Sequence, residues 1–239
     1  MRSQRVYAAH QPNFLPWCGY FNKIITSDFF IILDDVQIPK KGGSWINRHK
    51  LLSNGNPIWM TIPIKRSHSG FQLISEVEVD SKSDWKYDYL RRIQHMYRKA
   101  RYYAETQRLL ELLFSRSNSE KIAQNNSNII VGLLQELELP AKHLVLSSEM
   151  NLSYKSTSRL VEIGKKIEGK VYLSGLGSSG YLDLSEFRKE GISVMYQEFR
   201  ESPYQQIMSK NFHPSLSIVD ALMNIGLSQT REYIAGRKF

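Results

Sequence analysis

The sequence predicts an α/β fold with a Rossmann-like, mainly parallel sheet, flanking helices, a β-hairpin and a helical insertion. An apolar run at 6–9, a helical stretch from Pro16 and a second apolar run at 29–33 predict a right-handed parallel strand-helix-strand unit. The dipeptide Asn54-Gly55 lies between two strand-like runs and predicts a hairpin turn. Further along the chain, apolar residues recur three and four positions apart, as they do in helices.

The remaining elements follow from the same spacings and from helix caps. Strands are expected near 45–52, 58–62, 143–146, 171–173 and 192–196, and helices at 84–100, 104–116, 120–137, 156–166, just before Gly191, and at 217–224, with Gly226 ending the last one. We therefore expect a single α/β domain over residues 1–239 with a helical insertion at 83–139.

Composition excludes several classes of protein. Hydrophobic residues make up 41% and charged residues 23% of the chain, which is typical of a globular protein and not of a disordered chain or a fibre. No segment approaches the roughly 20 apolar residues that a membrane-spanning helix needs, and the N-terminus lacks a signal-peptide pattern, so we expect a cytoplasmic protein without a membrane span. The single cysteine, Cys18, excludes an internal disulfide and a thiolate zinc site.

Cys18 itself has two interpretations. It lies in the first turn of the helix expected after Pro16, where the helix dipole would lower the thiol pKa and favour a nucleophilic thiolate. Free cysteines are more often small buried hydrophobes.

The balance of charges favours anionic partners. The formal net charge is +9, which suits sugar nucleotides, nucleic acid or phospholipid head groups without choosing among them. Most basic residues are scattered, but the stretch from Arg91 to Arg101 is denser and is interleaved with tyrosines. Such interleaving occurs in proteins that bind single-stranded nucleic acid, although on a helix it also forms ordinary solvated faces.

The loop after the first strand is a candidate binding site. Pro12 and Pro16 fix the backbone φ angle, and Pro16 suits a first helical position. Backbone N–H groups at a helix N-terminus attract anions, and His10, Gln11 and Asn13 supply hydrogen-bonding side chains just before them. The loop could therefore hold a phosphate or a carboxylate; the alternative is a structural corner between a strand and a helix.

An acidic pair follows the second strand. Asp34 and Asp35 come directly after the run 29–33, as His10 follows 6–9. Because the carboxyl ends of parallel strands meet at one edge of a sheet, these groups should share one crevice. A metal site built from His10, Asp34 and Asp35 would require the chain to turn, since adjacent strand residues point to opposite faces, and we leave metal out of the predicted site.

Two further segments carry candidate ligand-binding residues. In the hairpin, alternation would place Trp45 and Asn47 on one face and Arg48, which could clamp a phosphate or simply face solvent, on the other. The glycine-rich loop 174–180 follows a strand and could bring backbone N–H groups to a phosphate. It could equally be a tight turn, since its GxGxxG spacing has no acidic ribose-binding residue after it.

The order of these motifs resembles the WbqC-like protein family. The matching segments span almost the whole chain: His10-Gln11-Pro12-Asn13, Leu15-Pro16-Trp17, Gly19-Tyr20-Phe21, Asp34-Asp35-Val36-Gln37, Trp45, Asn47-Arg48, Tyr172-Leu173-Ser174-Gly175, Tyr181-Leu182-Asp183 and Leu216-Ser217-Ile218-Val219-Asp220. The resemblance implies a role in making or decorating nucleotide-linked sugars for bacterial O-antigen and other surface polysaccharides. The chain departs from the family at Leu176 and Ser179, where a proline and often a basic residue are expected.

The leading hypothesis is an enzyme that attaches an acyl or aminoacyl group to the amine of a nucleotide-linked amino sugar. His10 is the candidate base, because an imidazole with a pKa of ~6.5 suits proton removal, and Asp35 would orient it or bind the sugar amine. The candidate substrate-binding residues are Gln11, Asn13, Trp17, Asp34, Gln37, Trp45, Asn47, Arg48, Ser174, Gly175 and Tyr181. The sequence does not specify the co-reactant, which could be ATP or an activated acyl or aminoacyl donor.

Two alternatives remain open. One is a non-catalytic protein of the assembly pathway that binds a sugar nucleotide or glycan. The other is an aminoacyl-tRNA-dependent transferase, whose charged tRNA partner would use the positive charge of the chain.

Overall fold

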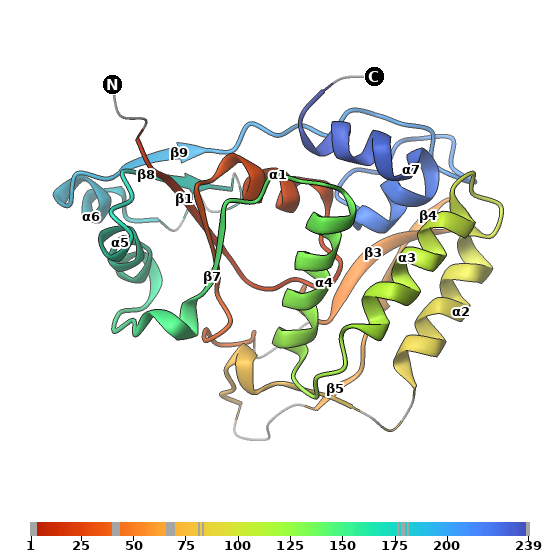
Figure 1. Ribbon diagram of the computed structural model, residues 1–239, viewed down its shortest axis with the longest axis horizontal. Helices are drawn as coiled ribbons and strands as arrows, with labels where there is room; N and C mark the ends of the chain where they lie inside the picture. The colour runs from red at the N-terminus through yellow and green to blue at the C-terminus, as the bar shows by residue number, and fades with distance from the viewer. Residues whose placement is uncertain are drawn as a thin grey trace.

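The computed structural model describes residues 4–39, 44–65, 70–80, 82, 84–175, 177, 180 and 182–237. A parallel sheet of five strands lies at one side of the molecule, in the order β7-β2-β1-β8-β9 (Figure 1). These strands are β1 (Val6–His10), β2 (Phe29–Ile32), β7 (His143–Leu146), β8 (Val171–Ser174) and β9 (Ser193–Tyr196). The α/β class and the mainly parallel sheet predicted from the sequence are therefore confirmed.

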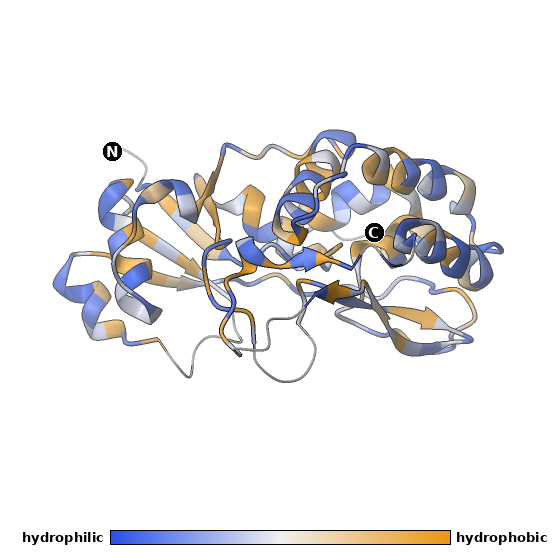
Figure 2. Cartoon of the chain, turned by 90° about the horizontal axis from the view of Figure 1, so that it is seen from below, coloured by the Kyte–Doolittle hydropathy of each residue, from blue (hydrophilic) through white to orange (hydrophobic). Residues whose placement is uncertain are grey.

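Helices cover both faces of the sheet, because the strands are apolar on both sides. Ala8 packs with α1 (Cys18–Thr26) in the larger hydrophobic cluster, whereas Tyr7 and Ala9 belong to a second cluster with residues of α5 (Ser156–Lys166) and α6 (Leu184–Lys189). Figure 2 shows the strands as mainly hydrophobic and the helices around them as hydrophobic toward the interior and hydrophilic outside. Successive residues of β1 thus face opposite helical layers.

The chain reverses its direction of winding next to β1. It moves from β1 to β2 and β7 on one side, and later adds β8 and β9 on the other side. The β1–β8 register contains the pairs Val6↔Val171 and Tyr7↔Tyr172, whereas β1 and β2 remain paired up to His10. The two central strands therefore separate toward their carboxyl ends at the topological switch point, where open α/β sheets bind ligands.

The predicted helical insertion consists of α2 (Trp85–Tyr97), α3 (Tyr103–Ser115) and α4 (Ile122–Glu136), which follow the short strands β5 (Ile64–Lys65) and β6 (Glu78–Val79). Side chains from these helices join the same hydrophobic cluster as α1 and the sheet. Organisation as a single domain remains a prediction. No helix among the described residues has the length and apolar composition needed to cross a membrane.

The hairpin forms as predicted but begins later. It consists of β3 (Arg48–Ser53) and β4 (Asn56–Thr61), and Asn54 (φ 49°) and Gly55 (φ 74°) supply the two positive φ values of a type I′ turn. The expected alternation between Trp45 and Asn47 is wrong, because these residues lie in a turn in which the Asn47 N–H donates to the Ser44 carbonyl (3.1 Å).

The last helix is longer than predicted. α7 (Ile218–Ile234) has a kink at Gly226, whose φ of 76° ends the first helical segment as expected. The Tyr102 ring lies so close that a β-carbon at position 226 would be 2.7 Å from it, so a glycine is required. The chain then resumes its helix, because Tyr233 and Ile234 are buried against the core.

Candidate functional site

A cavity of about 730 Å³ lies at the topological switch point. Its walls come from the end of β1, from α1, from the loop after β8 and from the segment that follows β9. Its polar and aromatic lining residues include His10, Gln11, Trp17, Lys23, Tyr172 and Gln197. The volume lies within the range of about 300–1,000 Å³ that is usual for small-molecule sites.

The loop that forms one wall is held by distant parts of the chain. Asn126 of α4 donates from Nδ2 to the Pro12 carbonyl (2.8 Å), and His49 of β3 donates from Nδ1 to the Phe14 carbonyl (3.3 Å). Tyr20 Oη donates to the carbonyl of Gln11 (3.0 Å). These bonds satisfy backbone acceptors that have no partner in regular secondary structure, so the loop is rigid without being part of the sheet.

The C-terminal helix completes the anchoring. Ser217 Oγ donates to the Leu15 carbonyl (2.6 Å), and the Ile218 N–H donates to the Pro16 carbonyl (2.9 Å). Leu15 has a left-handed backbone (φ 41°) that these contacts maintain. The prediction that Pro16 is the first helical residue is wrong: α1 begins at Cys18, after an extended Trp17, because the chain at Pro16 bonds to α7 instead.

His10 is the histidine of the cavity. Its ring meets Trp17 and Tyr20 edge-on, with centroid separations of 5.7 and 5.0 Å. Nδ1 lies 3.2 Å from the Gln11 carbonyl, which can only accept, so Nδ1 carries the proton and Nε2 has a free lone pair. Burial, followed by the nearby charge of Lys23, lowers the His10 pKa to about 3 although the Gln11 carbonyl opposes this shift. His10 is therefore neutral at physiological pH, unlike the titrating imidazole expected from the sequence.

Lys23 is the residue that the sequence analysis missed. Only 5% of this side chain is exposed, and its Nζ donates to the Ala9 carbonyl (3.1 Å), at the place where β1 leaves β8. Burial lowers the Lys23 pKa to about 8. Gly19 also lines the cavity and lies four residues before Lys23, hence on the same face of α1. That spacing was the available signal, but a lysine in the last turn of a helix ordinarily faces solvent.

The structure does not bring Asp35 to His10. Asp35 accepts hydrogen bonds from Arg159 of α5 and from Ser147 Oγ, and within the described part of the chain no hydrogen bond or ion pair joins it to His10. The reason is geometric: His10 packs against α1 on one face of the sheet, whereas Arg159 belongs to the helix on the opposite face. The Gln11 carbonyl, and not Asp35, orients the His10 ring.

Asp34 serves the same corner as Asp35. It is buried and accepts bonds from Ser148 Oγ (2.6 Å), the Ser148 N–H (3.0 Å) and Ser147 Oγ (3.2 Å). The chain turns after β2, so both carboxylates reach Ser147 and hold the short helix η2 (Ser147–Met150). In the described ranges there is no cluster of three or more His, Cys, Asp or Glu side chains that could hold a metal ion.

Three candidate residues, Trp17, Trp45 and Arg48, are connected through Trp59 by a series of aromatic and cation–π contacts that begins at the cavity. Trp17 lies 6.0 Å from Trp45, Trp45 lies 5.0 Å from Trp59, and the Arg48 guanidinium lies 4.0 Å from the centre of the Trp59 ring. Trp45 is 38% exposed. These contacts connect Trp17, Trp45 and Arg48 in series, and of the three only Trp17 lines the cavity.

The remaining candidates are dispersed. Asn13 is buried, and neither of its amide atoms has a hydrogen-bond partner among the residues described; buried Asn47 donates to the Ile62 carbonyl (3.0 Å). Gln37 is exposed and bridges to Leu73.

In the glycine-rich loop, Ser174 is fully buried at the end of β8. Gly175 and Gly177 line the cavity, so these two glycines lie at the candidate site. Tyr181, Leu176 and Ser179 lie outside the described residues.

Cys18 and Asp220 are both buried in the protein interior. The expected dipole effect on Cys18 is wrong, because burial raises the pKa of this thiol well above its usual value, with further contributions from the charges of Glu201 and Asp220. Asp220 is buried and accepts bonds from Tyr97 Oη (2.7 Å) and Tyr204 Oη (2.8 Å). Cys18 thus matches the buried hydrophobe that was its alternative interpretation.

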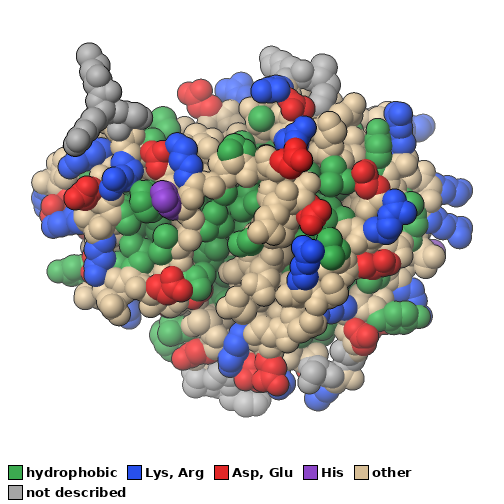
Figure 3. Space-filling model, in the orientation of Figure 1, with side chains coloured by type: hydrophobic (Ala, Val, Ile, Leu, Met, Phe, Trp, Pro, Cys, Tyr) green, Lys and Arg blue, Asp and Glu red, His purple; other side chains and the backbone are tan. Residues whose placement is uncertain are grey.

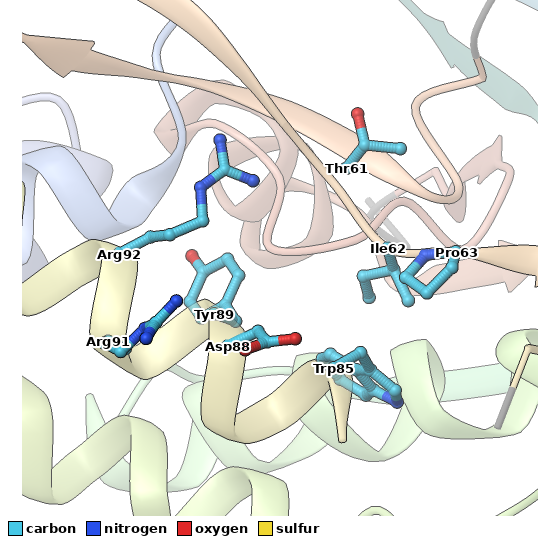
Figure 4. Close-up of a pocket in the computed structure, with 8 residues that line it drawn as sticks. All are labelled: Thr61, Ile62, Pro63, Trp85, Asp88, Tyr89, Arg91 and Arg92. Carbon is cyan, nitrogen blue, oxygen red and sulfur yellow. The ribbon is translucent and has the colours of Figure 1, made fainter. Parts of the chain in front are cut away.

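The basic stretch on α2 borders a different hollow. Figure 4 shows Arg91 and Arg92 extending from α2 toward the end of the hairpin, around a space of about 290 Å³ that Asp88 also lines. Both arginines are exposed. On the face shown in Figure 3, basic and acidic side chains are interspersed and do not gather into one patch. The switch-point cavity is the better candidate site, because it lies at the carboxyl ends of the strands and the buried charged side chain of Lys23 lines it, whereas both arginines of the α2 hollow are exposed.

Comparisons with known proteins agree with the order of motifs. The family model described as "WbqC-like protein family" matches residues 11–232. An uncharacterized protein of Mycobacterium tuberculosis (strain ATCC 25618 / H37Rv), Rv1507c, is 28% identical over 219 residues, which cover 90% of this chain and 92% of that protein. No solved structure matches the chain.

Proposed function

Because this chain belongs to the WbqC-like protein family, we propose that it is an enzyme of bacterial surface-polysaccharide biosynthesis. The reaction transfers an acyl or aminoacyl group to the amine of a nucleotide-linked amino sugar. One observation carries the proposal: neutral His10 and the buried ammonium group of Lys23 line the same cavity at the switch point of the sheet. A cytoplasmic location is part of the proposal.

The two groups suit the two charges that acyl transfer develops. The sugar nitrogen attacks the acyl carbon, a new C–N bond forms, and the donor's leaving group departs while the nitrogen gives up a proton. A base with a pKa of about 3 is too weak to remove a proton from a free ammonium ion. Nε2 of His10, which has a free lone pair, therefore accepts the proton only after the C–N bond has formed and made the sugar nitrogen more acidic. The positive charge of Lys23 stabilises negative charge in the cavity.

The other cavity residues suit a sugar nucleotide. Trp17 offers an aromatic wall against which a ring can stack, and Gln11 offers an amide for hydroxyl groups. In this proposal the acyl group is either activated by ATP during the reaction or supplied by an already activated donor, such as a charged tRNA.

A second candidate function has its own support. A pKa near 3 is far from the value that favours proton transfer at neutral pH. The cavity could therefore bind a sugar nucleotide or glycan without chemistry, with His10 accepting a hydrogen bond from a hydroxyl group.

A single assay separates the two functions. The protein is incubated with nucleotide-linked amino sugars and candidate donors, with and without ATP, and products are sought as a mass gain. The proposal expects a gain that His10→Gln abolishes and that His143→Gln, a change at an exposed histidine on β7, leaves intact. Measurable binding with no gain across the panel would favour the non-catalytic function.

A further inference from the structure

Lys23 is a buried cation without a counter-charge. The single hydrogen bond that its Nζ makes is to a neutral group, the Ala9 carbonyl, and no carboxylate lies within 4.0 Å of it among the residues that the structure describes. An ammonium group has three N–H donors, so two are left for other partners. Burial of an unpaired charge is unfavourable, and proteins normally compensate it with an ion of opposite sign.

Among the described residues that line the cavity, no other side chain has a fixed charge to offer a ligand. His10 is neutral, and Gln197 Nε2 is committed to the Gly19 carbonyl (2.8 Å) and to Asn22 Oδ1 (2.7 Å). Lys23 alone, of the groups that line the cavity in the described ranges, is an ammonium or guanidinium. An anion entering the cavity would therefore meet one buried positive charge in a medium where water screens it poorly.

A purely structural role explains only part of this arrangement. The Ala9 carbonyl lies where β8 has left β1, so it needs a donor, and Lys23 supplies one. A neutral amide would satisfy the same carbonyl without placing a charge in the interior. The charge itself is left unexplained unless something negative binds beside it.

We propose that Lys23 is the oxyanion-binding residue of the switch-point cavity, where its ammonium group binds a phosphate or carboxylate oxygen of the ligand. The inference rests on the proposed function for the identity of that ligand: the diphosphate of the nucleotide-linked sugar or the carboxylate of the acyl group. In either case the Ala9 carbonyl holds Nζ in place before the ligand arrives, so little ordering is needed on binding.

The test measures calorimetric affinities of three probes: inorganic pyrophosphate, UDP-glucosamine, and N-acetylglycine as the carboxylate. Lys23→Met removes both the charge and the donor, whereas Lys23→Gln keeps a donor for the Ala9 carbonyl without the charge. We expect both variants to bind the recognised probe at least tenfold more weakly than the wild type. Lys99→Met removes a charge from an exposed position beyond α2 and should leave the affinities unchanged.

Acetylation of the wild-type protein provides a readout that does not depend on variants folding. Acetic anhydride is applied with and without each probe, and the modified lysines are located by peptide mapping. Bound anion should slow acetylation of Lys23 at least tenfold and leave Lys99 unaffected. Acetylation of Lys23 at the same rate with and without each of the three probes, or Lys23→Gln binding as tightly as the wild type, would overturn the inference.

The outcomes also separate this inference from the proposed function. Protection by pyrophosphate but not by UDP-glucosamine supports the oxyanion site and contradicts the proposed substrate class. Protection by N-acetylglycine alone assigns the site to the carboxylate. UDP-glucosamine that binds equally to wild type, Lys23→Met and Lys23→Gln contradicts the role of Lys23 and leaves the proposed function in place.

Discussion

His10 and His49 have closely similar surroundings, but His10 lines the cavity whereas His49 lies in the interior. In each, Nδ1 faces a backbone carbonyl of the same loop, aromatic rings flank the imidazole, and burial lowers the pKa to about 3. At His49, however, Nε2 lies 3.1 Å from the Tyr89 hydroxyl, so both ring nitrogens have protein partners. At His10, which lines the cavity, the second nitrogen has no hydrogen-bond partner among the described residues. A lowered pKa is thus common to both histidines, and they differ in whether the second ring nitrogen has a partner within the described residues.

The sharpest test of that difference is His10→Gln. Proton transfer by a positioned side chain contributes about 10²–10⁴-fold, so turnover should fall by a factor in this range while the free energy of unfolding changes by less than about 1 kcal/mol. Product formation and urea unfolding are measured on the same preparation. Loss of stability as large as that of a His49 variant would mean that His10 is structural too.

Acid pH should affect both histidines alike. Their folded pKa values of about 3 lie below the usual 6.5, so the unfolded chain binds more protons between these limits, and stability must fall as pH drops from about 6.5 toward 3. Each site contributes on the order of 5 kcal/mol over the whole window. Urea unfolding at several pH values should show a flatter dependence for His10→Gln and for His49→Gln than for the wild type; unchanged slopes would show that neither histidine is buried as described.

His49→Ala should be the more damaging change to the fold. It removes a ring stacked on Phe14 (centroids 5.0 Å apart) and the donor to the Phe14 carbonyl, and it leaves the Tyr89 hydroxyl without its partner. We expect a loss of about 3 kcal/mol in the free energy of unfolding. Tyr89→Phe, which removes one hydrogen bond only, should cost about 1 kcal/mol. Equal effects of the two changes would contradict this account.

The smallest effect is expected at Trp45. Its ring is 38% exposed and adjoins Trp17, so Trp45→Ala should weaken sugar-nucleotide binding about fivefold, or about 1 kcal/mol, with little change in stability. Tyr154→Ala, at an exposed aromatic residue before α5, is the matched control. Wild-type affinity of the Trp45 variant would show that the sugar nucleotide does not reach Trp45 and contacts the cavity alone.

Features with a local cause could be predicted from the sequence. The continuous apolar run at 29–33 and the pair Asn54-Gly55 specify their strand and turn whatever surrounds them, and both appear where expected. The order of strands and helices then places His10 at the ligand-binding edge of the sheet.

Features that depend on distant contacts could not. Asp35 lies just after β2 and His10 ends β1, yet Asp35 pairs with Arg159, more than a hundred residues later, on the opposite face of the sheet. Lysine side chains usually lie at the surface. Lys23 is buried because β1 separates from β8, which leaves the Ala9 carbonyl without a strand partner and available to the Lys23 ammonium group. The predicted helix start at Pro16 also fails because of a distant contact: the Pro16 carbonyl accepts the Ile218 N–H of α7, and α1 begins at Cys18.

The bond between Ser217 and Leu15 joins residues 202 positions apart in the chain. A ribosome adding about 5–20 residues per second would need roughly 10–40 s to make the intervening segment. Throughout that interval the loop beside His10 lacks the contacts that hold Leu15 in its left-handed conformation. The wall of the cavity therefore matures only after α7 has emerged, and a nascent chain that already carries His10 and Lys23 does not yet have the site that we propose.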